Sequence, residues 1–516
     1  MEKFLPLING KDIDTGSYEY FPYIDKLLVE FKKTREIIKD TKKGNTPQNA
    51  KEYIYGKYCL NQYEDFTTTI QAAHKAFEKF KKTLLHARKK IFYDMYELLT
   101  KKKEDFIKIL ILEGHPRKLA EWEFEGMQIG SSRETIDFYF SQIRKEIGRY
   151  GSEIVYWSRK PDGVVCLSPP GNASASNSYN AILAFITGNS LIVKPPFRTP
   201  LSTIFLWKEI VWEALKNNGA PEGFVNIILG NSQKIMEAWL NSSLVNDIIY
   251  FGTSKKGLDV GSKIYAAGKK PILELSGNDL FLVWKDADIE ESTKSLLDCF
   301  LGSTQICMVP KIAIIHQKIY EKFLNVFVKK VKALKFGLPS DRETIFSPVG
   351  KIKEFFEFLN DTLEKGGKII CGGNRVNHFG EIDNTGLYIQ PTLLEIDDSC
   401  NLKSMKCFED EIFFPLLPLV RIRGGDKDVF EKMIDIVSTH EYGLRTSLWA
   451  SSYKYLRKFA KNLDNTGLLR INTRHVGFSR YLSTHGGTKR SGGPFGEMNY
   501  FWQKTSHLQG VTRIVK

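Results

Sequence analysis

Two segments of the chain carry residue types that suit covalent chemistry on a carbonyl carbon. Cys307 ends a small polar turn at 302–307, and Glu274 ends an apolar run within 271–277. A thiol can attack a carbonyl, and a carboxylate can later activate the water that hydrolyses the product. Taken singly, a cysteine is more often a small buried hydrophobe and a terminal glutamate is more often solvated. The two residues therefore indicate an enzyme only if a ligand site accompanies them.

A glycine turn offers such a site. Gly252 and Thr253 follow an apolar run at 247–251 and open a helix-like stretch that contains Gly257. A strand–helix turn of this kind brings backbone N–H groups and the positive end of the helix dipole close to a phosphate. The spacing is GxxxxG, without the Walker Lys-Ser/Thr, so the turn alone is weak evidence. Lys194, at the end of another strand, suits a ribose, although a lone lysine is more often a surface residue.

The elements that must position these residues alternate along the chain. Short runs rich in Val and Ile lie at 164–167, 191–193, 224–229 and 248–251, with helix-like segments between them. Strands buried on both faces and joined by helices predict a parallel α/β sheet. The spacing of apolar residues predicts helices over about 66–147, and a second α/β region follows from about 288 to 480. Residues 1–60 are the least legible.

Composition limits the class of protein. A chain of 516 residues predicts two or three domains. Its seven cysteines are odd in number, form no CxxC and fit no zinc spacing, so we expect free thiols, a reducing compartment and no metal. The first residues lack the apolar core of a signal peptide, and no uncharged apolar run reaches ~18 residues. These features predict a cytoplasmic protein without a membrane span.

The net charge of +14 is compatible with nucleic acid, an anionic surface or an acidic substrate as partner. However, the basic pairs are scattered along the chain and interleaved with acidic residues. The densest run, 101–103, is followed at once by Glu104 and Asp105. This pattern favours solvated helix faces over a groove that follows phosphates, so we predict no nucleic-acid partner.

From about residue 63 onward the chain resembles the aldehyde dehydrogenase superfamily. The resemblance is specific because several segments appear in the family's order and spacing. They lie at 168–172, 188–195, 219–226, 250–254, 274–277, 305–307, 411–415 and 486–492.

The resemblance implies a role for each candidate catalytic residue. Cys307 would attack an aldehyde to form a thiohemiacetal, with the oxyanion held by the Asn172 side chain and the Cys307 N–H. Hydride transfer to a nicotinamide would leave a thioester, and Glu274 would activate water to release the acid. Considered alone, Asn172 is more readily explained as the cap of the helix that follows it.

The resemblance also implies NAD or NADP as cofactor. Lys194 and Glu411 would hold the two riboses, Phe413 would pack near the nicotinamide, and the turn at Gly252, Thr253 and Gly257 would face the pyrophosphate. Considered without the resemblance, Glu411 is one more acidic residue of the run 409–411, and Phe413 is an aromatic residue of the core.

The chain departs from the family pattern at several positions. Gly171 replaces an aromatic residue beside Asn172, and Ser276 and Asn278 alter the segment after Glu274. Phe197 stands where many NAD-preferring members have a glutamate on the adenine ribose. Without that carboxylate a 2′-phosphate is not repelled, so the sequence leaves NAD and NADP both open.

The substrate pocket is less defined. Ile306 and Met308 flank the thiol and are expected in the pocket wall, and by the same resemblance Asn180 and His485 are tunnel residues. His485 is equally compatible with a hydrogen-bonded loop histidine. The Ile/Met wall indicates an apolar or aromatic aldehyde as the small-molecule substrate.

Two other functions stay open at this stage. One is a CoA-acylating or reductive member of the superfamily, against which the presence of Glu274 argues. The other is a catalytically silent relative with a structural or nucleic-acid-binding role, against which the joint presence of Cys307, Glu274 and Asn172 argues.

The resemblance finally implies a domain layout. A Rossmann-like cofactor domain would take 1–147 and 163–285, with 1–60 as a divergent lead-in, and 286–480 would form the catalytic domain that carries the thiol. A hairpin at 148–162 and the tail at 481–516 would form a small β element that pairs with a second subunit, giving a homodimer or homotetramer.

Overall fold

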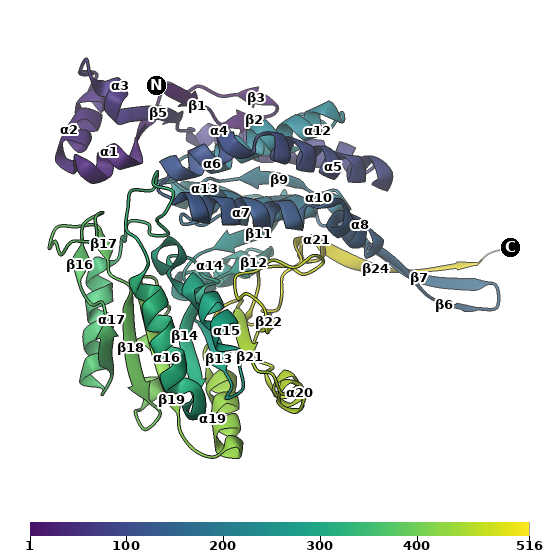
Figure 1. Ribbon diagram of the computed structural model, residues 1–516. Helices are drawn as coiled ribbons and strands as arrows, with labels where there is room; N and C mark the ends of the chain where they lie inside the picture. The colour runs from purple at the N-terminus through teal and green to yellow at the C-terminus, as the bar shows by residue number, and fades with distance from the viewer. Residues whose placement is uncertain (515–516) are drawn as a thin grey trace.

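Two seven-stranded sheets form the framework of the chain in the computed structural model, which describes residues 1–514 (Figure 1). The first sheet has the order β12 (Lys270–Glu274), β11 (Val245–Phe251), β8 (Val164–Ser168), β9 (Ser190–Val193), β10 (Val225–Ile227), β2 (Leu7–Ile8) and β3 (Lys11–Asp12). The strands from β12 to β10 pair in parallel, which confirms the predicted sheet. The two short strands from the N-terminal segment extend the sheet in antiparallel pairing.

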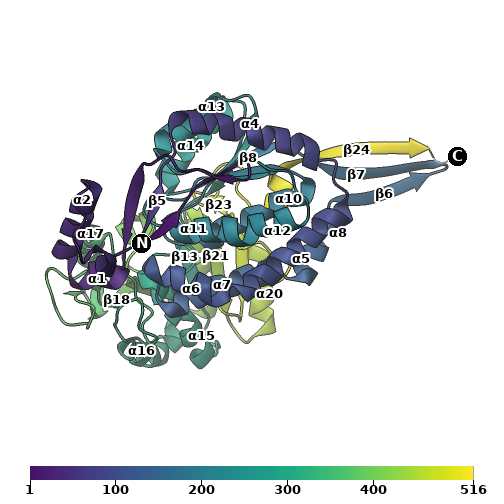
Figure 2. The same ribbon diagram turned by 90° about the horizontal axis from the view of Figure 1, so that it is seen from above.

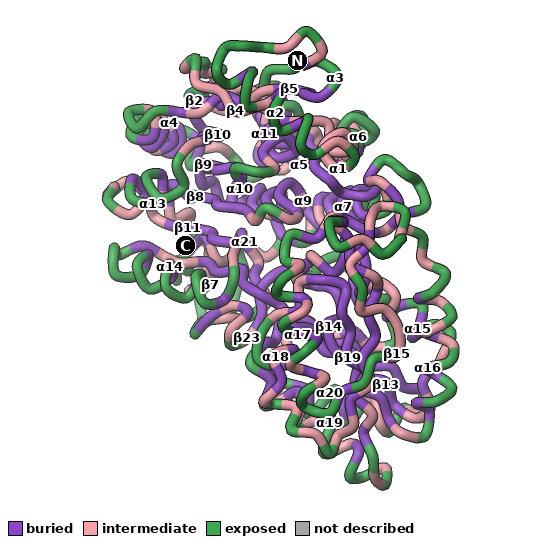
Figure 3. Tube along the Cα trace, turned by 90° about the vertical axis from the view of Figure 1, so that its left-hand side faces the viewer, coloured by how far each residue is buried: buried purple, intermediate pink, exposed green. Residues whose placement is uncertain are grey.

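Helices cover both faces of this sheet because its strands are apolar on both sides. Before it come α4 (Tyr63–Phe80), α5 (Leu85–Lys101), α6 (Lys103–Leu112), α7 (Arg117–Gly130) and α8 (Arg133–Ser141). Between its strands lie α9 (Ser174–Tyr179), η1 (Asn180–Leu183), α10 (Ala184–Thr187), α11 (Leu201–Phe205), η2 (Leu206–Trp212), α12 (Glu213–Asn217), α13 (Ser232–Asn241) and α14 (Ser254–Ala266). Strands β8, β9 and β11 are buried almost throughout, as the tube in Figure 3 shows.

The second sheet has the order β15 (Lys368–Cys371), β18 (Thr392–Asp397), β19 (Leu416–Ile422), β14 (Pro310–His316), β13 (Asp279–Val283), β21 (Arg445–Trp449) and β22 (Leu468–Ile471). Its principal helices are α15 (Ile289–Leu296), α16 (Gln317–Lys332), α17 (Ile352–Glu364), α19 (Asp426–Thr439) and α20 (Tyr453–Asn462). Smaller elements are η3 (Leu297–Thr304), β16 (Arg375–Val376), β17 (Tyr388–Ile389), η4 (Leu402–Ser404), α18 (Lys406–Glu409), β20 (Tyr442–Gly443) and β23 (Thr488–Lys489). Strand β13 already belongs to this sheet, so the second sheet begins before the expected division at 285/286.

The N-terminal segment is folded against the first sheet. Strands β1 (Glu2–Phe4), β5 (Ile54–Cys59) and β4 (Tyr18–Pro22) form a sheet of their own, and α1 (Ile24–Val29), α2 (Phe31–Lys42) and α3 (Ala50–Tyr53) lie between its strands in sequence. Tyr58 packs edge-on against Phe197, with ring centroids 5.9 Å apart, and its hydroxyl donates to the Phe197 carbonyl at 2.7 Å.

A three-stranded antiparallel arm extends from the body of the molecule (Figures 1 and 2). It consists of β6 (Arg144–Tyr150), β7 (Glu153–Pro161) and β24 (Ser506–Ile514), and the short helix α21 (Phe501–Lys504) precedes its last strand. The hairpin expected at 148–162 therefore begins earlier, at Arg144, inside the region 66–147 that was predicted to be helical, because the last helix, α8, already ends at Ser141. Every residue of β6 is exposed, so this strand lacks cover within one chain.

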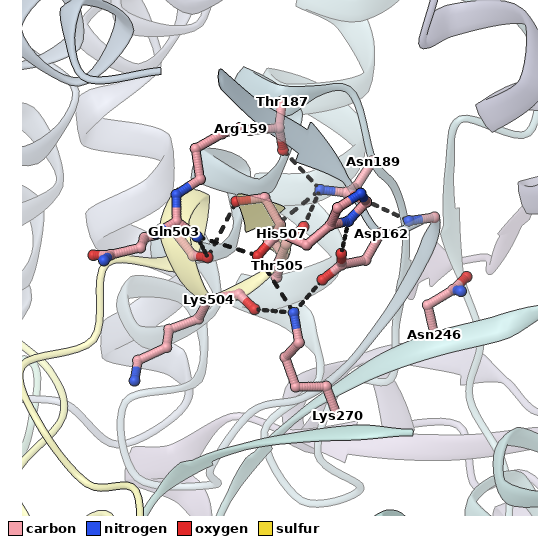
Figure 4. Close-up of polar contacts among 12 residues, drawn as sticks. Arg159, Asp162, Thr187, Asn189, Asn246, Lys270, Gln503, Lys504, Thr505 and His507 are labelled. Atoms are coloured by element: carbon pink, nitrogen blue, oxygen red, sulfur yellow. Dashed lines mark hydrogen bonds and ion pairs between the residues drawn. The ribbon is translucent and has the colours of Figure 1, made fainter. Parts of the chain in front are cut away.

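A polar cluster fastens the C-terminal segment to the amino ends of the parallel strands (Figure 4). Asp162 pairs with Lys270 and accepts a hydrogen bond from His507 Nδ1 at 2.8 Å. The Asn189 amide donates to the Thr505 carbonyl at 2.8 Å, and its Oδ1 accepts from Gly163 N at 2.8 Å. This C-terminal docking cluster fixes the base of the arm.

Among the helices of residues 1–514, none has both the length and the apolar character needed to cross a bilayer. All seven cysteines are free thiols.

Candidate active site

A cavity of about 360 Å³ lies at the carboxyl ends of the first sheet's strands, where that sheet faces the second. Ligands bind at this edge in open α/β sheets because the strand-to-helix loops converge there. The cavity brings together most of the residues expected from the sequence, namely Asn172, Gly252, Thr253, Glu274, Cys307, Glu411, Phe413 and His485.

The loop before the thiol has an unusual backbone. Gly302, Ser303 and Thr304 have φ values of 60°, 55° and 63°, in the left-handed region that costs non-glycine residues on the order of 1–3 kcal/mol each. Side-chain bonds hold this conformation, because Ser303 Oγ donates to Ser347 O at 2.6 Å and Thr304 Oγ1 donates to Cys299 O at 2.7 Å. The turn thereby directs Cys307 into the cavity wall.

Close contacts join this loop to both sides of the cavity. A Cβ atom on Gly277 would lie 2.4 Å from the Cys307 carbonyl oxygen, so only glycine lets the segment after β12 approach the thiol loop. From the other side, Asn172 Nδ2 donates to Gln305 O at 2.8 Å. The second N–H of this amide is available to a ligand in the cavity.

The resting thiol is protonated at neutral pH. Burial raises the pKa of Cys307 to about 12, with further contributions from Glu411 and Asp279, while Lys311 acts in the opposite direction. Lys311 is fully buried and donates to Thr304 O at 2.8 Å and Ile412 O at 2.7 Å. It thus links the thiol loop to the loop that carries Glu411 and Phe413.

Glu274 is fixed at the end of β12 with both carboxylate oxygens bonded. Oε2 accepts from Gly486 N at 2.8 Å, and Oε1 accepts from Asn499 Nδ2 at 2.8 Å. Burial raises the pKa of Glu274 to about 7, although these two bonds counteract part of the effect. Gly486 has a φ of 93°, and a Cβ there would lie 2.0 Å from Glu497 O, so glycine is required at this contact. A carboxylate with this pKa exchanges protons near neutral pH.

The glycine turn opens α14 as expected. Thr253 is the N-cap residue, lines the cavity and makes no side-chain bond to the first turn, and Ser254 N donates to Ser276 Oγ at 3.3 Å. Gly257 has a different position, because a Cβ there would meet the Leu275 side chain at 2.1 Å. Gly257 therefore lets α14 pack against the segment after β12, and it does not line the cavity.

Lys194 follows β9 and lies outside the cavity lining. It is 8% exposed, and its ammonium donates to Ser232 Oγ at 3.3 Å. Burial lowers the pKa of Lys194 to about 8, and the like charge of Lys256 adds to this effect.

Glu411 and Phe413 come from the second sheet's side of the cavity. Glu411 Oε1 accepts from Gly277 N at 3.3 Å, and burial raises the pKa of this carboxyl group. The Phe413 ring has the ammonium groups of Lys311 and Lys351 at 5.2 Å and 5.7 Å from its centroid.

The remaining expected residues line a small space that adjoins the cavity. Ile306, Met308, Asn180 and His485 surround this space of about 30 Å³, and His485 also lines the main cavity. Asn180 Nδ2 lies 3.3 Å from His485 Nδ1, so the two proposed tunnel residues are in contact.

Several residues of the site escaped the sequence interpretation. They are Asn177, Lys311, Lys351, Gly486 as a backbone donor, and Asn499. Lys311 had a recognisable signal, since it is a charged residue at the start of the otherwise apolar run 309–315. Asn499 had none, because its partner Glu274 is 225 residues away in sequence.

Comparison with known proteins identifies the family. Residues 39–511 match the model of the aldehyde dehydrogenase family. The chain is 30% identical over 455 residues to a lactaldehyde dehydrogenase of Methanocaldococcus jannaschii, covering 87% of this chain and 92% of the relative. It is 28% identical over 407 residues to a D-glyceraldehyde dehydrogenase (NADP(+)) of Thermoplasma acidophilum, covering 77% and 78%.

Solved structures of similar proteins have the same fold as this chain. A glyceraldehyde-3-phosphate dehydrogenase of Methanocaldococcus jannaschii, complexed with NADP, superposes with a TM-score of 0.76 at 27% identity and covers 88% of this chain and 95% of that one. An aldehyde dehydrogenase of Brucella melitensis biovar abortus shares the fold with a TM-score of 0.81 at 20% identity, covering 99% and 97%. The chain therefore belongs to the aldehyde dehydrogenase family and is an oxidoreductase that acts on an aldehyde with NAD or NADP as acceptor.

Proposed function

We propose that Cys307 is the nucleophile of this aldehyde oxidation. Its sulfur forms a bond to the aldehyde carbon, and the carbonyl electron pair moves to the oxygen. The second N–H of Asn172 and the Cys307 N–H stabilise the resulting oxyanion. When bound in the cavity, NAD or NADP supplies the acceptor for the hydride that leaves this carbon, and the carbonyl re-forms as a thioester.

We assign proton transfer to Glu274. Because the resting thiol is protonated, attack requires a base, and a carboxylate whose pKa is about 7 can accept that proton. The thiol proton then passes from Glu274 to solvent, and in the second half of the reaction the ionised carboxylate takes a proton from water. The hydroxide attacks the thioester, the carbon–sulfur bond breaks, the acid leaves, and the Cys307 thiolate regains a proton from Glu274. The bonds from Gly486 and Asn499 keep Glu274 in one orientation for both steps.

The donor groups around the cavity fit a dinucleotide. The first turn of α14 suits a pyrophosphate, and Lys194 has a free capacity to donate beyond its one bond to Ser232. Glu411 and Phe413 suit a ribose and a nicotinamide ring on the side nearer the thiol. In this proposal the first sheet's domain holds the cofactor and the second supplies the thiol.

NADP is the proposed preferred acceptor. Lys194 and Lys256 repel each other and both favour an anion between them, whereas Phe197 provides no carboxylate. Phe197 is 47% exposed and is held by its contact with Tyr58. A 2′-phosphate beside the two ammonium groups would be stabilised by them.

The arm supports an oligomer. Strand β6 is exposed along its length, and Tyr150 at its tip is 86% exposed. Isolated three-stranded sheets without a covered face are marginal in water, so a second copy of the chain is the proposed cover.

The observation that carries the proposed mechanism is the convergence of Cys307, Glu274 and Asn172 on one cavity. The test is the formation of NADPH from an aldehyde panel, with and without CoA, by the purified chain. Activity without CoA is expected. Turnover that requires CoA would replace hydrolysis by acyl transfer, and no turnover with any aldehyde would reject the mechanism.

A further inference from the structure

Lys311 is a buried charge beside the thiol loop that takes part in no ion pair. Its side chain is 0% exposed, and within residues 1–514 no carboxylate oxygen lies within 4.0 Å of its ammonium. Two of its three N–H groups donate to the carbonyls of Thr304 and Ile412, and the third has no acceptor among the described residues. An unpaired buried ammonium is costly, and an anion that forms beside it during the reaction would remove part of that cost.

A β-bulge gives Lys311 this position. The pairing partner on β14 advances from Pro310 to Ile312 between consecutive residues of β13, so Lys311 is the extra residue on β14. A bulge interrupts the alternation of side chains along a strand and changes the direction of the residue at the bulge. The ammonium therefore reaches the place where the thiol loop meets the loop from the second sheet's side of the cavity.

The ammonium is charged at neutral pH and acts on the thiol. Burial lowers the pKa of Lys311 to about 8, and Glu411 and Cys307 limit the decrease. The pKa of Cys307 is raised by burial, and Lys311 and Arg445 counteract this increase. The ammonium and the sulfur atom therefore each favour the charged form of the other.

The acidic groups near the thiol do not neutralise the two cations. Burial raises the pKa of Asp279 to about 8, so its protonated form predominates at pH 7. Glu411 then remains as one carboxylate against Lys311 and Arg445. The other titratable groups that line the cavity are Glu274, Lys351 and His485. Of these, the lysine offsets the glutamate, and the histidine is neutral because burial lowers its pKa to about 3. The surroundings of the sulfur atom are therefore positive overall.

On the basis of the proposed function, we infer that Lys311 is a positioning residue whose buried ammonium stabilises the thiolate of Cys307. After hydroxide has added to the thioester, the carbon–sulfur bond breaks and its electron pair stays on the sulfur atom. The ammonium keeps its own proton and offsets the new negative charge until Glu274 returns a proton to the sulfur. The bonds to Thr304 and Ile412 keep this positive charge in one place beside the thiol loop.

Alkylation of Cys307 by iodoacetamide tests this role without aldehyde or cofactor. The thiol is partly exposed and the reagent is uncharged, and only the thiolate reacts, so the rate reports the thiolate population. Lys311→Met removes the charge, and we expect Cys307 to react about 10-fold more slowly at pH 8, which corresponds to a rise of one unit in its pKa. Mass spectrometry of the Cys307 peptide measures the rate. Cys400 of the same chain is the internal reference, and its rate should stay unchanged.

A merely structural role of Lys311 predicts the opposite direction. Loss of its two bonds would loosen the thiol loop and expose the sulfur atom, so Cys307 would react faster. Lys311→Gln keeps an N–H donor without the charge, and it serves as the second uncharged variant if Lys311→Met does not fold. Lys311→Arg keeps the charge and should bring the rate back toward the wild-type value. A wild-type or faster rate in the uncharged variants would overturn the inference.

Lys269 provides the matched control. This lysine is also buried, with 7% exposure, and its ammonium also donates to two backbone carbonyls, those of Ser242 and Val245. It lies just before β12, at the amino end of the first sheet, so Lys269→Met should leave the alkylation of Cys307 at the wild-type rate. Equal slowing by both lysine variants would contradict the inference. Alkylation needs no turnover, so a wild type that oxidises no aldehyde would reject the proposed function and leave this result valid.

Discussion

The two ends of the first sheet contain polar clusters of opposite character. Lys270 and Glu274 begin and end the same strand, β12. At the amino end, Lys270 pairs with Asp162 inside the C-terminal docking cluster. At the carboxyl end, Glu274, Cys307 and Asn172 line a cavity. At the amino end of the sheet the charged groups pair with one another, which stabilises the fold. At the carboxyl end the polar groups line a cavity, where they can contact a ligand.

The comparison predicts that changes at the carboxyl end act on rate. Cys307→Ala removes the proposed nucleophile, and we expect a loss of at least about 10⁴-fold in kcat. Steady-state NADPH production measures this loss. Cys371→Ala, in the edge strand β15, is the matched control and should retain activity. Appreciable turnover by the Cys307 variant would mean that the chemistry lies elsewhere.

Glu274→Gln should slow the second half of the reaction most. The amide preserves size but cannot accept a proton, so hydrolysis should fall by about 10²- to 10⁴-fold. Because Glu274 also accepts the thiol proton, the burst measured by rapid mixing should be slower than in the wild type. It should still reach up to one equivalent of NADPH per site and then stall, with the acyl group found on Cys307 by mass spectrometry. Equal loss of the burst and of the steady state would assign Glu274 to thiol activation alone.

Acidity provides a further test of Glu274. Hydrolysis requires the ionised carboxylate, so the wild-type rate should rise about 10-fold per pH unit below an apparent pKa near 7 and level off above it. The same pKa, raised from 4.5, means that this group's contribution to stability is present at low pH and is lost between about pH 4.5 and 7. Glu274→Gln should therefore abolish the inflection in rate and make the free energy of unfolding less sensitive to pH between about 4.5 and 7. An unchanged inflection would point to another base.

Lys256→Ala tests the proposed preference for NADP. Removal of one of the two ammonium groups should raise KM for NADP by about 10-fold and leave KM for NAD nearly unchanged. Kinetics with each cofactor at saturating aldehyde measure the two values. Equal effects on both cofactors would indicate a general role at the pyrophosphate.

Substitutions at the amino end of the first sheet should lower the free energy of unfolding and leave the catalytic rate unchanged. Asn189→Ala removes the donor to Thr505 O and leaves Gly163 N without its acceptor, which should cost about 1–3 kcal/mol of unfolding free energy. Denaturant titration measures this loss, and kcat per folded active site should stay at the wild-type value. A large fall in kcat would show that the two ends of the sheet are coupled.

The parallel strands of the first sheet were predictable because β8, β9, β10 and β11 lie in short runs rich in Val and Ile, with helical segments between them. Strands β2 and β3 were not, since each has two residues and takes its pairing from the existing sheet edge. The start of the arm at Arg144 was missed for a similar reason. Its strand is exposed on both faces, so the sequence there has no alternation of polar and apolar residues.

Within the site, the chemically distinctive residues were predictable and their supports were not. Cys307 and Glu274 stand in segments whose residue types indicate their chemistry. The bonds from Asn499 and Gly486 to Glu274 join positions more than two hundred residues apart, and no local pattern reports them. Asn180 was identified as a tunnel residue, but its contact with His485 joins positions 305 residues apart, which no local pattern reports.

The pairing of β24 with β7 has a consequence for biosynthesis. Residues 506–514 complete a sheet whose other strands end at residue 161, so β7 has an open edge while the intervening chain is translated. Open strand edges recruit other chains. The nascent protein therefore passes through a period in which a chaperone or a neighbouring chain competes for that edge, and the arm is complete only once residues 506–514 have left the ribosome.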